Sequence, residues 1–359
     1  MAIGLSHGGS TIYSSPTLSN QILIGTREGA VTLERNANGS DWRITHRALA
    51  DKHISAIMKE PESELTFAGA FHGGVHVSAD DGKSWEGRGN GMTQNNVYSL
   101  AAKRIDGHVR VFAGTEPAHL FVSDDLGLNW RELSALRSVP SVPKWSFPAP
   151  PHISHVKHIN FDPDHPATIY ASVEVGGLLR STDGGAHWEE FPSLYEDVHR
   201  LMIHPSNAKF LYAVTGRGLY VGPEAGASWE QWTRREDEIG GYPDGFVFRP
   251  SDPKLMFMTA AHDAPGTWRT THFAGARISR SKDGGRSWEI LKNGLPDRLQ
   301  ASIEAFCLEE AGNSTAIYAA TTAGEIICSE DLGENWRVIA KGLPPISKGG
   351  HYRALVEAA

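Results

Sequence analysis

The chain has 359 residues, of which 40% are hydrophobic and 21% are charged, and its net charge is −8 at pH 7. No basic stripe or arginine-rich arm is present, which argues against a nucleic-acid partner. No stretch approaches the roughly 20 apolar residues of a membrane-spanning helix, and the first residues do not resemble a secretory signal. We therefore expect a cytoplasmic protein with no membrane partner.

One short pattern recurs along the chain at regular intervals. Five segments match Ser-x-Asp-x-Gly-x-x-Trp and end at Trp85, Trp130, Trp188, Trp288 and Trp336. Two eroded copies end at Trp42 and Trp229, so that successive Trp residues are 43, 45, 58, 41, 59 and 48 residues apart. This period is the size of one four-stranded propeller blade. The repeat therefore predicts seven blades.

Each repeat has the same predicted strand order. In the second repeat, strands are expected over Ile54–Ile57, Leu65–Ala70 and Val75–Ser78, and a fourth begins at Trp85. Ser and Asp side chains bond the backbone of the turn, and Gly supplies a positive φ. We predict an all-β fold over residues 1–359, a single seven-bladed β-propeller of four-stranded antiparallel blades.

Closure of the ring requires the two ends of the chain to meet. The first repeat begins with its second strand, Gln21–Thr26, and the chain ends with a spare strand, His351–Val356. The C-terminal strand is therefore expected to complete blade one, which would remove the open sheet edges.

The strand order sorts the loops onto two faces. The starts of the inner strands and the turns between second and third strands share one face, opposite the Ser-x-Asp turns. The predicted starts are His53, Asn96, His155, Asp197, Asp244, Ser302 and His351. The predicted turns contain Arg27 with Glu28, His72, Glu116, Glu174, Arg217, His262 with Asp263, and Thr321 with Thr322. Both sets are expected near the axis, where they would form a polar funnel.

Two insertions account for the longest spacings between repeats. Residues 131–153 contain Trp145, and residues 262–275 contain Trp268. Long structured loops in compact domains are usually binding loops or lids. Both insertions are predicted to lie on the funnel face, with their aromatic residues walling a pocket.

The histidines of the funnel suggest metal chemistry. The predicted ligand pool is His53, His72, His155, His262 and His351. With a carboxylate, imidazoles suit Zn²⁺, Mn²⁺ or Fe²⁺, and an open coordination position activates water or polarises a substrate. We predict a divalent-metal-assisted hydrolase or lyase that acts on a small polar, anionic or sugar-derived substrate.

Further residues of the funnel are assigned to catalysis and to substrate binding. Glu174, Glu116, Asp244 and Tyr242 are the predicted catalytic residues. Arg27 and Arg217 are expected to hold an anionic group, because guanidinium groups bind such groups in a bidentate way. Asn96, Trp145 and Trp268 are the other predicted substrate-binding residues.

The repeated motif resembles the Asp-box (BNR) repeat of sialidases, sortilin-type receptors, xyloglucanases and a photosystem-assembly propeller factor. The resemblance implies the propeller fold and a ligand face opposite the Asp boxes. It leaves two alternatives open: a glycoside hydrolase with a carboxylate pair, and a non-catalytic propeller that binds a protein or peptide. The sialidase segment Phe/Tyr-Arg-Ile-Pro is absent, and Thr26-Arg27-Glu28-Gly29 occupies the comparable region.

Overall fold

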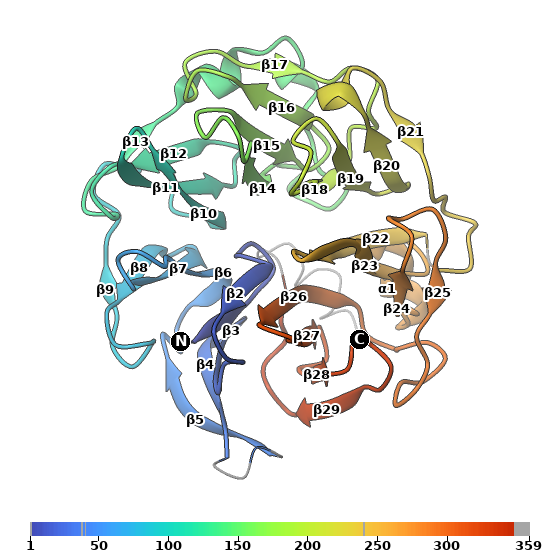
Figure 1. Ribbon diagram of the computed structural model, residues 1–359. Helices are drawn as coiled ribbons and strands as arrows, with labels where there is room; N and C mark the ends of the chain where they lie inside the picture. The colour runs from blue at the N-terminus through green and yellow to red at the C-terminus, as the bar shows by residue number, and fades with distance from the viewer. Residues whose placement is uncertain (1, 37–38, 40, 240, 348–359) are drawn as a thin grey trace.

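Seven β-sheets surround a common axis in the structure (Figure 1). The structure is a computed structural model that describes residues 2–36, 39, 41–239 and 241–347. Six sheets have four strands and one has five, and almost every neighbouring pair is antiparallel. The prediction of an all-β, seven-bladed propeller is confirmed.

The blades follow one another in chain order around the ring. Blade one has β1 (Ile3–Leu5), β3 (Gln21–Thr26), β4 (Gly29–Arg35) and β5 (Trp42–Ala48). Blade two has β6 (His53–Lys59), β7 (Thr66–Phe71), β8 (Gly74–Ser78) and β9 (Glu86–Gly87). Blade three has β10 (Val97–Ile105), β11 (His108–Thr115), β12 (Leu120–Ser123) and β13 (Arg131–Glu132). Blade four has β14 (Val156–Phe161), β15 (Ile169–Val173), β16 (Gly177–Ser181) and β17 (Glu189–Glu190).

The remaining three blades complete the ring. Blade five has β18 (Val198–Ile203), β19 (Leu211–Thr215), β20 (Gly218–Gly222) and β21 (Glu230–Gln231). Blade six has β22 (Tyr242–Arg249), β23 (Asp252–Ala261), β24 (Arg277–Ser281) and β25 (Glu289–Ile290). Blade seven has β2 (Ile12–Ser15), β26 (Ile303–Ala311), β27 (Ser314–Thr321), β28 (Ile326–Ser329) and β29 (Arg337–Ala340).

The Ser-x-Asp turns share one hydrogen-bond pattern, shown here for blade six. Ser281 Oγ donates to Asp283 Oδ1 and accepts the Gly285 N–H, both at 2.8 Å. Asp283 also accepts from the hydroxyl and N–H of Ser287, and these bonds lower the pKa of Asp283 to about 2. Trp288 Nε1 donates to the Gly285 carbonyl. The Ser–Asp and Ser–Gly bonds recur at Ser78, Ser123, Ser181 and Ser329.

The N-terminal segment supplies the inner strand of blade one. β1 runs parallel to β3, with Ile3 opposite Ile22 and Leu5 opposite Ile24. The prediction that the C-terminal strand fills this position is wrong, because β1 already occupies it; residues 351–356 themselves lie outside the described residues. A three-residue strand is too short to stand out from the sequence, which explains the error.

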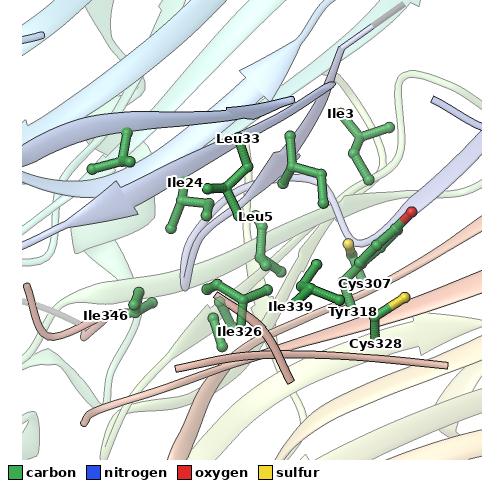
Figure 2. Close-up of a cluster of buried hydrophobic side chains, with 14 of the residues drawn as sticks. Ile3, Leu5, Ile24, Leu33, Cys307, Tyr318, Ile326, Cys328, Ile339 and Ile346 are labelled. Atoms are coloured by element: carbon green, nitrogen blue, oxygen red, sulfur yellow. The ribbon is translucent and has the colours of Figure 1, made fainter. Parts of the chain in front are cut away.

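The same segment then joins the last blade. β2 pairs in parallel with β26, with Ile12 opposite Leu308. Figure 1 shows this blue strand beside the red strands of blade seven. Figure 2 shows Ile3 and Leu5 in one buried cluster with Tyr318 and Ile326 of blade seven. Residues 2–15 therefore connect the first and last blades by both hydrogen bonds and apolar packing.

Between β1 and β2 the chain lies against the inner strands of other blades. The Gly8 N–H donates to the Ser55 carbonyl at 2.9 Å, and the Gly8 carbonyl accepts the Leu100 N–H at 2.9 Å. A Cβ atom on Gly8 would lie 1.9 Å from the Tyr98 carbonyl oxygen, and one on Gly9 would lie 1.9 Å from that of Ile57. Only glycine fits this close approach of backbones.

Candidate functional site

The inner strands of blades two to seven share an irregularity near their first residue. Their pairing with the second strand shifts register across Ile54/Ala56, Val97/Ser99, Val156/His158, Val198/Arg200, Pro243/Phe246 and Ile303/Ala305. The residues left out of the pairing are Ser55, Tyr98, Lys157, His199, Asp244 with Gly245, and Glu304. Such β-bulges re-aim a side chain and are frequent beside active sites.

Around these bulges the structure brings together a group of buried ionisable side chains, which we call the central cluster. No member has more than 9% of its surface exposed. The cluster consists of His7, Glu116, His155, Lys157, His158, Glu174, Asp197, His199, Arg200, Asp244 and Glu304.

Blade four holds the most densely paired part of the central cluster. His155 immediately precedes β14, and its Nε2 lies 2.7 Å from Glu174 Oε2. Its Nδ1 lies 3.6 Å from Glu116 Oε2, so the ring stands between two carboxylates. Lys157 Nζ lies 3.2 Å from Glu174 Oε2 and 3.3 Å from Asp244 Oδ1. Acidic and basic side chains therefore alternate from Glu116 to Asp244.

Blade five adds a second imidazole to Glu174. His199 Nε2 lies 3.3 Å from Asp197 Oδ1 and 3.9 Å from Glu174 Oε1. The other ring nitrogen, Nδ1, donates to the Pro243 carbonyl at 2.6 Å. The ring also packs on Tyr242, with 4.6 Å between ring centroids. These contacts hold the His199 ring in one orientation.

The N-terminal segment contributes a third imidazole. His7 Nδ1 lies 2.9 Å from the Glu304 carbonyl oxygen and 3.5 Å from Glu304 Oε2. The His7 carbonyl accepts from Arg200 Nη2 at 3.1 Å. Burial lowers the pKa of the Arg200 guanidinium, and the nearby Asp244 opposes that effect. The segment that closes the ring is thus also part of the polar centre.

Four of the predicted site residues lie together in the central cluster: His155, Glu116, Glu174 and Asp244. Tyr242 is buried at its edge, against His199. This convergence follows from the strand order, because the residues come from equivalent ends of blades three, four and six around one axis.

The other predicted histidines lie apart from this centre. His53 is buried, with its Nε2 3.1 Å from the Ser347 carbonyl oxygen, whereas His72 is exposed. His262 is exposed beside Asp263, and His351 lies outside the described residues. Among the described residues, two groups of three possible ligands come within 4.8 Å: His7, Asp244 and Glu304, and Glu174, Asp197 and His199. Neither group contains His53, His72, His155 or His262.

The predicted substrate-binding residues also make separate contacts. Asn96 Oδ1 accepts the His72 N–H at 3.1 Å. Arg217 is exposed and stacks on the Tyr195 ring, 4.2 Å from its centroid. Arg27 is half-buried, and its N–H donates to the Pro345 carbonyl. The structure does not bring the two arginines to the central cluster.

Of the two predicted tryptophans in the insertions, Trp268 reaches the edge of the cluster, whereas in the first insertion Phe147 takes this position instead of Trp145. In residues 131–153 the Phe147 ring lies 5.2 Å from His155, whereas Trp145 Nε1 donates to Ser141. Residues 262–275 contain the helix α1 (Pro265–Thr271), and Trp268 packs its edge against Tyr242. Trp268 is 7% exposed, so its faces are covered by protein.

Sequence reasoning missed His7, Lys157, His158, His199, Arg200 and Glu304. A signal was present for three of them, because Lys157, His199 and Glu304 each stand two positions after an aligned residue: His155, Asp197 and Ser302. His7 lies in a segment that the repeat does not cover.

A cavity lies on the opposite side of the ring centre. Its volume is about 320 Å³, and it lies between the N-terminal segment and the far ends of β14, β18 and β22. Phe161, Pro163 and Phe248 contribute apolar surface, while His158 reaches it from the central cluster. The inner strands end there, on the side of the Ser-x-Asp turns.

Comparison with known proteins gives a likeness of fold. No family model and no curated protein matches the sequence. An ancestral GH74 enzyme has a TM-score of 0.60 at 16% identity, with 79% of this chain and 37% of that one covered. The GH74 enzyme of Niastella koreensis has a TM-score of 0.61 at 18% identity, with 94% and 55% covered. The chain therefore spans well under two thirds of these enzymes.

A second kind of neighbour matches over nearly its whole length. YCF48 from Cyanidioschyzon merolae has a TM-score of 0.57 at 14% identity, with 87% of this chain and 96% of that one covered. YCF48 bound to D1 peptide has a TM-score of 0.50 at 17% identity, with 77% and 78% covered.

Within the described residues, no helix has the length and apolarity to cross a membrane.

Proposed function

We propose that the protein is an acid–base hydrolase or lyase that acts on a small polar substrate at the central cluster. The observation that carries this proposal is the burial of His155, Lys157, Glu174 and Asp244 in one paired group. Burying ionised groups costs several kcal/mol per ion, which pairing offsets only in part. Groups of this kind concentrate at catalytic sites, where their environment tunes proton transfer.

The contacts suggest distinct tasks for the residues of the central cluster. Glu174 orients His155 by the 2.7 Å contact, as a carboxylate does for a catalytic base. Glu116 and Asp244, which are 4% and 6% exposed, are the groups that would exchange protons with substrate. Lys157 places a positive charge beside Asp244, where it would stabilise negative charge that develops in the transition state.

A screen with matched variants tests this function. The wild-type chain would be assayed on nitrophenyl glycosides, phosphate esters, lactones and sugar acids, alongside Glu116→Gln and Asp244→Asn. Loss of a general acid or base costs about 10²- to 10⁴-fold in rate, so each variant should lose at least about 100-fold. Glu236→Gln, an exposed carboxylate in a loop, should keep full activity. Turnover that survives both central substitutions would contradict the proposal.

A non-catalytic, peptide-binding propeller is the second candidate. It is supported by the fold likeness to YCF48 bound to D1 peptide and by the part-apolar cavity beside Phe161 and Phe248. The GH74 neighbours support the narrower idea of a glycoside hydrolase, and for this reason the screen includes glycosides. Peptide binding that Phe248→Ser removes, without any turnover in the screen, would favour the second candidate.

A further inference from the structure

We propose a divalent-metal site formed by Glu174, Asp197 and His199, where blades four and five meet. Their possible ligand atoms all lie within 4.8 Å of one another, and all three residues are buried. The site deepens the function proposed above by adding an electrophile to the central cluster. A catalytic role for the ion rests on that function, whereas binding of the ion does not.

The orientation of His199 is the first argument for the site. Its Nδ1 faces the Pro243 carbonyl at 2.6 Å, and a carbonyl only accepts hydrogen bonds, so Nδ1 carries the hydrogen. A neutral His199 ring therefore has its lone pair on Nε2, which has no hydrogen-bond partner among the described residues. A backbone carbonyl on the second ring nitrogen is the usual arrangement for a histidine that binds a metal.

The atoms that His199 faces are the second argument. Nε2 lies 3.3 Å from Asp197 Oδ1 and 3.9 Å from Glu174 Oε1. A metal ion between Nε2 and the two carboxylates would be attracted by all three groups. Ligands at about 2.1 Å from a tetrahedral ion lie about 3.4 Å apart, so the two distances from His199 would change by roughly half an ångström or less on binding.

The third ligand, Glu174, turns one of its two carboxylate oxygens toward His199. Lys157 and His155 contact Oε2 of Glu174, so Oε1 is the oxygen turned toward His199. Asp197 Oδ1 also has no hydrogen-bond partner among the described residues. Two carboxylates and one imidazole leave at least one coordination position open, which is typical of catalytic rather than structural metal sites. This mixed donor set suits Mn²⁺ or Zn²⁺.

The other group of possible ligands provides an internal comparison. Lys157 stands beside a ligand of each group, 3.2 Å from Glu174 Oε2 and 3.3 Å from Asp244 Oδ1, so its charge does not distinguish them. In the group of His7, Asp244 and Glu304, the nitrogen that faces the Glu304 carboxylate, Nδ1 at 3.5 Å, is the one that donates to the Glu304 carbonyl at 2.9 Å. In the group of Glu174, Asp197 and His199, by contrast, Nε2 faces the carboxylates and Nδ1 donates to the carbonyl, so we assign the ion there.

Metal titration tests the assignment without any substrate. The purified chain would be stripped with chelator and titrated with MnCl₂, and separately with ZnCl₂, in a calorimeter. We expect one ion per chain, with affinity lowered at least about tenfold in Asp197→Asn and in His199→Gln. Glu304→Gln should bind as the wild type does. The thermal midpoint of each metal-free variant shows whether it is folded.

Two results of the titration would overturn the site. An absence of saturable binding in the wild type does so directly, as does binding that Glu304→Gln removes and Asp197→Asn spares. If a variant does not fold, electron spin echo spectroscopy of the wild type with Mn²⁺ should detect a single imidazole nitrogen, and a spectrum without nitrogen coupling refutes the assignment. If the protein binds the metal but turns over no substrate, only the proposed function is contradicted. If it turns over substrate in the presence of chelator and binds no metal, only the metal site is contradicted.

Discussion

His158 belongs to the central cluster and also lines the cavity on the opposite side of the ring. Burial lowers its pKa well below the ordinary value, and the nearby positive charge of Arg200 lowers it further. The folded protein therefore holds this imidazole neutral under conditions in which an unfolded chain would protonate it. His158 consequently links the stability of the fold to pH.

The pH dependence of unfolding checks this effect. Above about pH 6.5 the residue is neutral in both states, whereas at lower pH only the unfolded chain gains the proton. The free energy of unfolding should fall by up to about 1.4 kcal/mol per pH unit from this group. Urea unfolding of wild type and His158→Gln at pH 7 and pH 5.5 measures the difference.

The variant should have the flatter dependence. His204 is a suitable comparison because its pKa is also lowered by burial, but it is more exposed. His204→Gln is expected to change the slope less than His158→Gln. Identical slopes in wild type and His158→Gln would show that His158 does not couple folding to pH.

At the scale of the strand, the recurring bulges explain why the central cluster forms. A regular strand alternates its side chains between two faces, so residues at successive positions cannot all reach the ring axis. The bulges at Lys157, His199 and Glu304 interrupt this alternation at the same level of neighbouring blades. An irregularity of the backbone thus directs these polar side chains toward the site.

The Ser-x-Asp turn is the other recurring element, and we expect its serine to contribute measurably to the free energy of unfolding. Ser281→Ala removes the acceptor of the buried Gly285 N–H and a donor to Asp283. Leaving a buried donor without a partner costs about 1–3 kcal/mol, which should appear in chemical unfolding. Ser287→Ala in the same turn removes an exposed hydroxyl and should cost less. An equal loss in both variants would contradict the importance of the buried serine.

At the scale of the whole molecule, residues 6–11 pass close to the inner strands of other blades. Gly8→Ala would place a methyl group 1.9 Å from the Tyr98 carbonyl oxygen. Backbone would have to move, and we expect a loss of at least about 3 kcal/mol in the free energy of unfolding.

Gly266→Ala is the matched control, because no atom lies within 4 Å of its added Cβ. Gly266 lies in α1, where alanine is the better helix former, so its effect should stay within about 1 kcal/mol. Thermal and urea unfolding of both variants would measure the loss of stability in each. A Gly8→Ala protein as stable as the wild type would mean that the segment does not approach the inner strands as described.

Most of the architecture was predictable because it depends on a repeated local pattern. The spacing from Trp42 to Trp336 predicted the blades, and the strand order correctly brought Glu116, His155 and Glu174 together. These features require only that each repeat folds as its neighbours do. Aligning the repeats therefore predicts which residues of different blades lie at equivalent positions around the ring.

The residues outside the repeat were not predictable in the same way. The strand Ile3–Leu5 is short, and the partner of Ile12 is the distant Leu308. His199 and Lys157 required knowledge of a bulge, which breaks the alternation that a sequence reading assumes. The exposed positions of His72 and His262 depend on how the loops turn at the rim, and the alignment does not specify this.

The pairing of β2 with β26 has a consequence for the folding kinetics. It joins two ends of the described chain, so nearly every other blade lies within the loop that this contact closes. Contacts between residues far apart in sequence slow the search for the native state, and a high contact order predicts slow folding. The blades can form from local hairpins, but the final ring depends on one late, long-range encounter. Until that encounter, the inner edge of β26 stays open to strands of other molecules, which favours aggregation during refolding.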